Sequence, residues 1–232
     1  MKKALLIGLN YKGTPNELPD CEKDVNDIER LLPKDYAVTK LTSVTAKDFY
    51  NLLVQFKSQL TPTDTLLVYY SGHGTQFPSS AEKDGYQEGL VLWTPQSGFE
   101  IFKDADLKLL LAAMNCKVIL CLDSCFSGGM ETLVATYGIP RFKEFAKDKI
   151  YKTVATPYRS LARQIHLFAC AENQTAQSTG TGGLFTKAIL SVLKKGSKPV
   201  FKVFWMAKLK CGKIQTPQLI LSGGTKIEDL IF

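Results

Sequence analysis

Histidine and tryptophan are scarce in this chain of 232 residues, which contains only two of each. Long apolar runs are absent as well: none approaches the roughly 18 residues that a membrane-spanning helix needs, so we expect no transmembrane segment. The N-terminus has a basic start followed by the apolar run Ala4–Leu9, but no small-residue cleavage site follows it. We therefore interpret this run as a first β-strand and not as the core of a signal peptide.

Closely spaced cysteine pairs are also missing, although the chain has six cysteines. Cys116, Cys121 and Cys170 lie in apolar stretches, where a free thiol behaves as a small hydrophobic side chain. Cys121 and Cys125 lie on a strand and at its end rather than on a helix, which argues against a metal site. The pattern favours reduced thiols and a cytoplasmic location over a disulfide framework.

The net charge of +7 would permit an acidic partner, but the lysines are dispersed along the chain. The sequence has no aromatic RNA-binding motif, no helix-turn-helix signature and no zinc-finger spacing. We therefore expect no nucleic-acid partner; a salt-dependent association with DNA or RNA would be the sign of one.

Short apolar runs alternate with amphipathic segments along the chain. The apolar runs predict strands at Ala4–Asn10, Ala37–Leu41, Thr65–Ser71, Leu90–Trp93, Val118–Asp123, Ile165–Ala171 and Gln218–Leu221. The segments between them predict helices at Cys21–Leu32, Lys47–Leu60, Asp104–Met114, Leu184–Leu193 and Val200–Lys208, with Asp20 and Thr45 as N-caps of the first two. This order indicates an α/β domain with a mostly parallel sheet.

Two of the predicted strands end in reactive side chains set among small residues. Thr65–Ser71 is followed by the letters GHG, which contain His73, and Val118–Asp123 is followed by SCFSGG, which contains Cys125. A lone histidine after a strand is more often a hydrogen-bonded turn residue, and a cysteine beside serine and glycine is usually inert. Chemistry in such sheets collects at the carboxyl ends of the strands, however, and the two residues together suggest a cysteine nucleophile with an imidazole base.

The sequence around these residues resembles the metacaspases, within the caspase-like cysteine peptidases of family C14, clan CD. YYSGHGTQ and LDSCFSGG are similar to the family's histidine and cysteine motifs. ALLIGLNYKGTPNELPDCEKDV and CAENQTAQSTGTGGLFTKAIL resemble its first strand and its small-subunit strand, loop and helix, so the resemblance covers roughly residues 3–195. It implies a caspase-like α/β fold, with a central, mostly parallel six-stranded sheet flanked by helices. The expected single domain, residues 1–232, comprises a large-subunit-like part (1–130), a basic loop (131–163) and a small-subunit-like part (164–232).

The resemblance also implies a role for each catalytic position. Cys125 would be the nucleophile, and His73 would be the base that activates it and later protonates the leaving amine. The backbone N–H groups of Cys125 and Gly74 would form the oxyanion hole. No third, orienting acid is obvious in the sequence, which is consistent with a dyad.

The S1 pocket of the family matches four positions in this chain, which are Cys21, Asp24, Ser71 and Asp123. Two buried carboxylates at the floor of a pocket select a cationic side chain. Metacaspases cleave after Arg or Lys and caspases after Asp, so the resemblance implies a cysteine endopeptidase with basic specificity. Without it, Asp24 would be an ordinary exposed helix residue, and His166 is expected to be structural.

The chain also departs from the family pattern. Phe126 stands where metacaspases usually carry histidine. We expect that the protein requires no cofactor. Many metacaspases bind calcium through clustered acidic side chains. The candidates for such a site in this chain are sparse; they are Glu82, Asp84, Glu88 and Glu131. The basic residues within 141–163 are expected sites of self-cleavage.

Peptide or protein substrates are the expected partners, with no membrane partner and a monomer as the default state. The alternative function is a catalytically silent caspase-like interaction module, although this chain keeps both His73 and Cys125.

Overall fold

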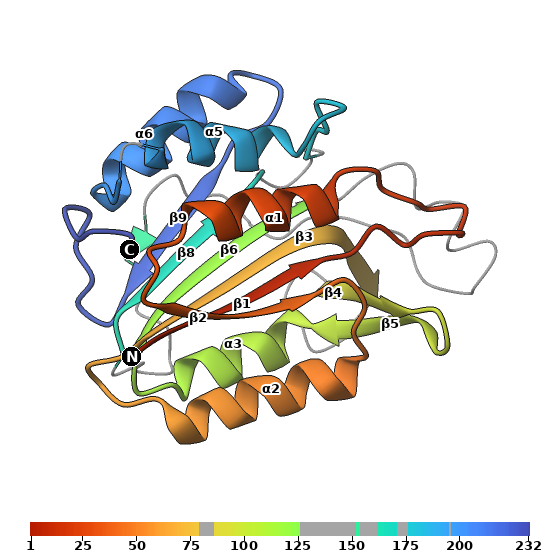
Figure 1. Ribbon diagram of the computed structural model, residues 1–232, viewed down its shortest axis with the longest axis horizontal. Helices are drawn as coiled ribbons and strands as arrows, with labels where there is room; N and C mark the ends of the chain where they lie inside the picture. Colours follow the sequence, from red (N-terminus) through yellow and green to blue (C-terminus); the bar gives the residue numbers. More distant parts are fainter. Residues whose placement is uncertain (79–85, 126–151, 154–161, 171–175, 195) are drawn as a thin grey trace.

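A sheet of mostly parallel strands runs through the centre of the protein, with helices on both of its faces (Figure 1). The computed structural model describes residues 1–78, 86–125, 152–153, 162–170, 176–194 and 196–232. Its strands are β1 (Lys2–Gly8), β2 (Tyr36–Leu41), β3 (Thr65–Pro78), β4 (Tyr86–Thr94), β5 (Gly98–Lys103), β6 (Lys117–Cys125), β7 (Lys152–Thr153), β8 (Gln164–Phe168) and β9 (Gln218–Ser222). Its helices are α1 (Cys21–Leu31), α2 (Ala46–Gln59), α3 (Asp104–Ala112), α5 (Leu184–Leu193) and α6 (Val200–Cys211).

The strand order is β2-β1-β3-β6-β8-β9-β7, and a hairpin of β4 and β5 is attached to β3. The pairs from β2 to β8 are parallel, and β9 runs antiparallel to β8. This confirms the predicted α/β fold: six strands form the central sheet, and β4, β5 and the short β7 bring the described total to nine. The sequence did not predict β5, because its half-buried residues form no continuous apolar run and pairing with β4 stabilises it.

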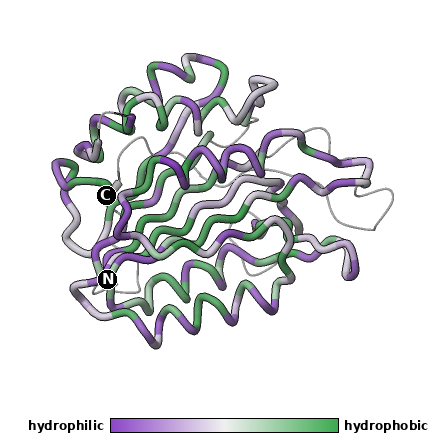
Figure 2. The backbone as a smooth tube through the Cα atoms, viewed as in Figure 1, coloured by the Kyte–Doolittle hydropathy of each residue, from purple (hydrophilic) through white to green (hydrophobic). Residues whose placement is uncertain are grey.

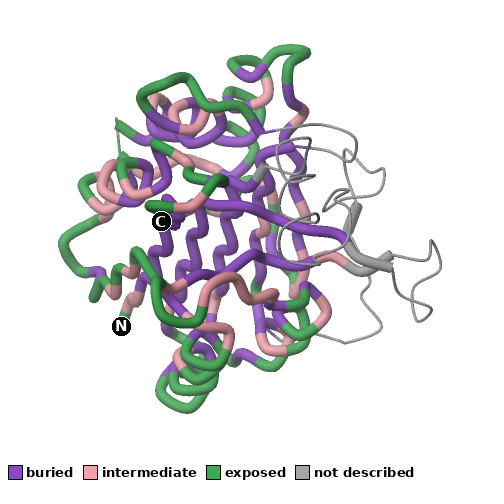
Figure 3. Tube along the Cα trace, turned by 90° about the vertical axis from the view of Figure 1, so that its right-hand side faces the viewer, coloured by how far each residue is buried: buried purple, intermediate pink, exposed green. Residues whose placement is uncertain are grey.

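The core lies on both faces of the central strands. Helices α1, α5 and α6 cover one face, and α2 and α3 cover the other (Figure 1). The central runs of these strands are largely apolar (Figure 2) and buried (Figure 3); they are Ala4–Ile7 in β1, Leu66–Tyr70 in β3 and Val118–Leu122 in β6. Because both faces are covered, the side chains within these runs do not alternate between apolar and polar.

One helix cap agrees with the sequence and one does not. The Thr45 hydroxyl accepts a hydrogen bond from the Asp48 N–H at 3.0 Å, as predicted for the start of α2. Asp20 precedes α1, but its side chain makes no capping bond. Its carboxylate instead accepts a hydrogen bond from the Ser178 hydroxyl, far along the chain, because the loop before α5 packs against the start of α1.

Strand β3 is longer than predicted. It continues beyond Ser71 to Pro78, pairing with β6 as far as His73 and then with β4 from Gly74 onward. The strand therefore changes partner at the histidine instead of ending before it. Among the described residues, no helix combines the length and apolar character needed to cross a bilayer.

Candidate active site

His73 and Cys125 are direct neighbours across the pair of central strands β3 and β6. Their Cα positions are register partners, two residues beyond the partners Ser71 and Asp123. The fold thus brings the backbones of the two predicted catalytic residues together at the carboxyl end of the sheet. The side chain of Cys125 lies outside the part of the chain that the structure describes, and so does Phe126.

The His73 side chain is buried, with 7% of its surface exposed, and one of its nitrogens is fixed by a backbone group. Nε2 lies 2.9 Å from the carbonyl oxygen of Asn16. Because a carbonyl oxygen only accepts, Nε2 carries the proton, and Nδ1 of the neutral ring is left with its lone pair. Burial lowers the pKa of His73 to about 4, against which the hydrogen bond to Asn16 acts, so the ring is neutral at neutral pH.

Two tyrosine hydroxyls form hydrogen bonds to the backbone of His73. The His73 N–H donates to the Tyr11 hydroxyl at 2.8 Å, and the His73 carbonyl accepts from the Tyr70 hydroxyl at 2.6 Å. The Tyr11 ring also packs on the imidazole, with 4.7 Å between ring centroids. A Cβ atom on Gly72 would lie 2.6 Å from the Tyr70 hydroxyl oxygen and 2.7 Å from that of Tyr11, so only glycine fits there.

All four residues predicted for the S1 pocket line one pocket next to His73. It has an empty volume of about 350 Å³, including its open mouth. The predicted residues are joined by neighbours from the loop before α1 and the loop before α5; the described lining is Leu18, Pro19, Asp20, Cys21, Asp24, Ser71, Gly72, Asp123, Ala176, Gln177, Ser178 and Gly183. The structure therefore places the predicted residues in one cavity, although they come from three different elements.

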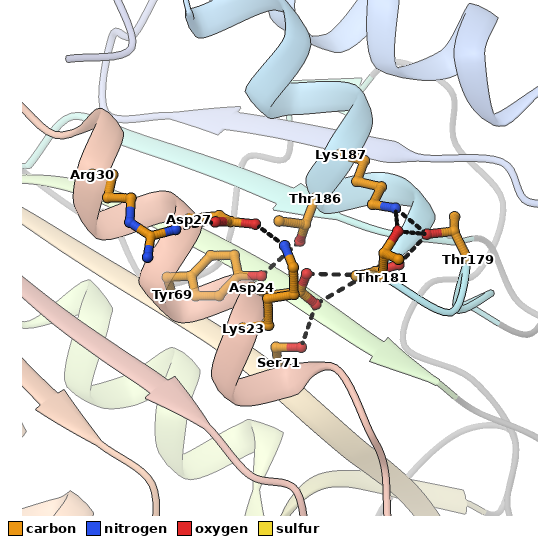
Figure 4. A network of polar contacts seen from close by, with 12 residues as sticks. Lys23, Asp24, Asp27, Arg30, Tyr69, Ser71, Thr179, Thr181, Thr186 and Lys187 are labelled. Atoms are coloured by element: carbon orange, nitrogen blue, oxygen red, sulfur yellow. Dashed lines mark hydrogen bonds and ion pairs between the residues drawn. The ribbon is translucent and has the colours of Figure 1, made fainter.

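The carboxylates of Asp24 and Asp123 are buried in this pocket and held by neutral donors. Asp24 accepts from the Ser71 hydroxyl at 3.1 Å and from the Gly183 N–H at 3.0 and 3.1 Å (Figure 4). Asp123 accepts from the Thr186 N–H at 3.1 Å and from the Thr186 hydroxyl at 2.5 Å. No ion pair to either carboxylate occurs within the described ranges.

The two carboxylates are close enough to oppose each other's ionisation. A Cβ atom on Gly183 would lie 2.3 Å from one oxygen of Asp123 and 3.1 Å from one oxygen of Asp24. Burial, followed by the charge of Asp123, raises the pKa of Asp24 to about 7. Burial also raises the pKa of Asp123, which the hydrogen bonds from Thr186 oppose. A cation that entered the pocket would stabilise the ionised forms of both carboxyl groups. The pocket is therefore suited to binding a positively charged group.

Sequence reasoning located the loop before α5 but missed that this loop and the first turn of α5 bind the carboxylates of the pocket. Gly183 and Thr186 supply the donors to the two carboxylates, and the Lys187 ammonium donates to the hydroxyls of Thr179 and Thr181 in the same loop (Figure 4). The only sequence signal was the run TGTGG before the helix. A glycine-rich loop marks a close approach of backbone to another group, but it does not name that group.

The other predicted residues are placed as follows. Cys21 is buried at the first residue of α1, and Gly74 pairs with Leu90 of β4. His166 lies in β8, with its ring 6.2 Å from that of Phe168, away from the pocket. In the part of the chain that the structure covers, no group of three acidic, cysteine or histidine side chains could hold a metal ion.

Several expectations fall outside the described residues. Of the calcium candidates, Glu82, Asp84 and Glu131 lie there, and Glu88 alone is within a described strand. The basic loop is likewise described only at residues 152–153 and 162–163.

A protein-family model for the caspase domain, Peptidase C14, matches residues 1–224. Among curated relatives, metacaspase-6 of Arabidopsis thaliana is 34% identical over 146 residues, which are 56% of this chain and 39% of that protein. Metacaspase-1 of Plasmodium falciparum is 28% identical over 217 residues, which are 83% of this chain and 34% of that protein. The chain thus spans little more than a third of the length of these relatives.

Solved structures show the same fold. A crystal structure of a Geobacter sulfurreducens protein matches with a TM-score of 0.73 and 23% identity, covering 97% of this chain and 94% of the other. Caspase-1 of Spodoptera frugiperda matches with a TM-score of 0.58 and 12% identity, covering 97% of this chain and 92% of the other.

Replacing Tyr11 by Phe tests the support behind the histidine. Tyr11→Phe leaves the buried His73 N–H without its acceptor, so we expect the free energy of unfolding to fall by about 1–3 kcal/mol in urea denaturation. Tyr36→Phe is the matched control, because the buried Tyr36 hydroxyl has no hydrogen-bond partner among the described residues. An equal loss of stability in both variants would contradict the role assigned to Tyr11.

Replacing Asp24 by Asn tests the electrostatics of the pocket. Because the pKa of Asp24 is raised to about 7 in the folded state, the protonated carboxyl stabilises the fold at low pH. This contribution is complete below the pKa of the unfolded chain, about 4, and is lost as the pH rises through 7. Asp24→Asn should therefore be more stable than the wild type at pH about 8, by roughly 1–3 kcal/mol, and similar to it at pH about 4.

Asp27→Asn on the same helix is the control. Asp27 is partly exposed and paired with Lys23 and Arg30, so this variant should show no gain in stability at high pH. Thermal unfolding measured across the pH range distinguishes the two variants. A wild-type protein whose stability relative to Asp24→Asn does not change with pH would refute the raised pKa.

Proposed function

The chain belongs to the caspase-domain peptidase family, and on that premise we propose that it is a cysteine endopeptidase that cleaves peptide bonds after arginine or lysine. The observation that carries the proposal is the position of His73 and Cys125 as register partners beside a pocket with two buried carboxylates. The family supports peptide-bond hydrolysis, and the acids of the pocket support the choice of a basic side chain.

In the proposed mechanism, the neutral His73 ring accepts the proton of the Cys125 thiol at Nδ1, because the other nitrogen is already bound to the Asn16 carbonyl. The sulfur attacks the carbonyl carbon of the scissile bond and forms a tetrahedral intermediate. The N–H groups of Cys125 and Gly74 are the proposed donors to its oxyanion. His73 then protonates the leaving amine, the thioester forms, and a water molecule hydrolyses it by the reverse proton transfers.

Burial weakens His73 as a base in the proposed mechanism. A pKa of about 4 makes the free imidazole a weak base, so the imidazolium persists only while a negative charge on sulfur or oxygen lies beside it. In this dyad the Asn16 carbonyl orients the His73 ring, a role that a carboxylate has in catalytic triads. It fixes the tautomer without adding a charge to the site.

Specificity for a cationic side chain follows from the charge in the pocket. Asp24 and Asp123 already receive hydrogen bonds from neutral donors, but no described cation compensates their charge. A guanidinium or ammonium group would supply that compensation, whereas an acidic side chain would bring a further negative charge next to the two carboxyl groups. The proposal therefore excludes cleavage after aspartate.

A panel of fluorogenic peptides with Arg, Lys or Asp at the cleaved position tests the proposal. We expect turnover of the Arg and Lys peptides by the wild type and none by Cys125→Ala. Asp24→Asn should reduce kcat/KM for the Arg peptide by about a hundredfold, because one buried charge partner is lost. Asp27→Asn, on the same helix, should keep wild-type kinetics.

Two other outcomes would contradict the proposal. Turnover of the Asp peptide alone would overturn the pocket assignment. No turnover of any peptide, with or without calcium, would favour a catalytically silent interaction module. Comparing wild type and Cys125→Ala by mass spectrometry during the same incubation tests self-cleavage within residues 141–163, which should occur in the wild type only.

A further inference from the structure

Helix α6 presents an apolar stripe to solvent on the side opposite its buried face. Phe201, Trp205 and Leu209 follow one another at intervals of four, and 42%, 56% and 68% of their respective surfaces are exposed. Residues four apart lie on one side of a helix, so these three form a continuous ridge. The opposite side packs into the core through Val200, Val203, Phe204, Ala207 and Cys211. We call the three exposed residues the α6 ridge.

The charged residues of α6 and of the sequence directly around it have a single sign. Every charged residue from 194 to 214 is a lysine; these are Lys194, Lys195, Lys198, Lys202, Lys208, Lys210 and Lys213. Lys202 and Lys210 are exposed on α6 itself, and the Lys208 ammonium lies 5.6 Å from the centre of the Trp205 ring. The nearest carboxylates in sequence after this stretch are those of Glu228 and Asp229, in the segment that bonds to the first turn of α6.

Two further apolar residues near the ends of α6 are also exposed. Ile214, just after α6, is 64% exposed, and Leu230, which is 52% exposed, pairs with Pro199 at the start of the helix. α6 lies on the outer side of α5, away from the sheet (Figure 1). Exposed apolar residues grouped on one side of a helix, as in the α6 ridge, mark an interaction surface, whereas isolated ones need no explanation.

We propose that the α6 ridge, with its lysine border, docks the protein onto an anionic lipid surface. An aromatic and aliphatic face bordered by lysines is the pattern of a helix that lies in the plane of a membrane interface. The rings and the leucine would enter the boundary of the acyl chains while the lysines contact lipid phosphates.

Charge selects this occupant over a second copy of the chain. Two copies meeting through the ridge would bring two sets of lysines together, with no carboxylate on α6 and only Glu228 and Asp229 beside its first turn to pair with them. An anionic bilayer supplies both the negative charge and the apolar layer that the surface lacks. The absence of a long apolar run, which led us to expect no membrane partner, excludes a spanning helix but not one that lies on the surface.

Vesicle binding tests the proposal, with Cys125→Ala as the parent protein so that self-cleavage cannot interfere. We expect this protein to sediment with vesicles of equal parts phosphatidylserine and phosphatidylcholine, and not with phosphatidylcholine alone. Trp205 is the exposed tryptophan, since Trp93 is 9% exposed, so its emission should shift to shorter wavelength on binding. Trp205→Phe should abolish that shift.

Charge and apolar variants with matched controls locate the surface. Lys202→Glu combined with Lys210→Glu should lower the vesicle partition coefficient by about tenfold or more. Lys47→Glu with Lys57→Glu, on exposed positions of α2, makes the same change in net charge and should have a much smaller effect. Leu209→Ser should weaken binding, and Leu109→Ser, on a residue of α3 that is 47% exposed, should not. Circular dichroism of each variant reports whether it is folded.

Three results would overturn the proposal. The first is no sedimentation with the anionic vesicles, and the second is an equal loss for the α2 and α6 charge variants. The third is a lipid-free oligomer, seen in analytical ultracentrifugation, that Leu209→Ser dissociates, because the ridge would then be an interface between copies. Binding to soluble heparin or DNA that Leu209→Ser leaves unchanged, without vesicle binding, would instead indicate a purely electrostatic site.

Discussion

Two carboxylates buried side by side are the constraint on which the arrangement of the site depends. Asp24 comes from α1 and Asp123 from β6, and each loses the solvation that would stabilise its charge. The backbone and side-chain donors of the loop and helix that follow residue 176 replace part of that solvation. The raised pKa of Asp24 indicates that these donors do not fully replace the lost solvation of its charge. The pocket therefore carries an electrostatic cost in the empty protein that a cationic side chain would remove.

The strand β3 connects this pocket to the catalytic positions. Ser71 donates to Asp24, and His73 lies two residues further along the same strand, where it faces the carbonyl of Asn16. Gly72 between them allows the two tyrosine hydroxyls to reach the backbone. A change in the position of β3 would thus move both the pocket and the two positions proposed to be catalytic. This coupling explains why polar groups of the core, such as the Tyr11 hydroxyl, support the site although they lie behind it.

The sequence was sufficient to predict the α/β fold and the neighbouring positions of His73 and Cys125, and the family resemblance indicated four of the residues that line the pocket. The apolar runs that alternate with amphipathic segments indicate the fold, and the family motifs indicate the site residues; both are local features of the sequence. It was not sufficient for the continuation of β3 past Ser71, because the partner strand β4 provides the hydrogen bonds that extend it. Nor could it indicate the Asn16 carbonyl or the Thr186 donors, since a backbone carbonyl has no sequence signature and Thr186 meets Asp123 only in the folded chain. The α6 ridge was hidden for a similar reason: a stretch with apolar residues on two faces predicts a helix, but only the packing shows which face is left exposed.

Proton release on binding of a cation tests the central claim most directly. Isothermal titration calorimetry of Cys125→Ala with a peptide that ends in arginine amide, in buffers of different ionisation enthalpy at pH about 6.5, measures this release. Because burial raises the pKa of Asp24 in the empty pocket to about 7, most of this carboxyl is protonated at that pH; we therefore predict that binding releases protons, and that Asp24→Asn releases clearly fewer. Binding without proton release, or an equal release in Asp24→Asn, would contradict the account of two buried carboxylates that await a cationic side chain.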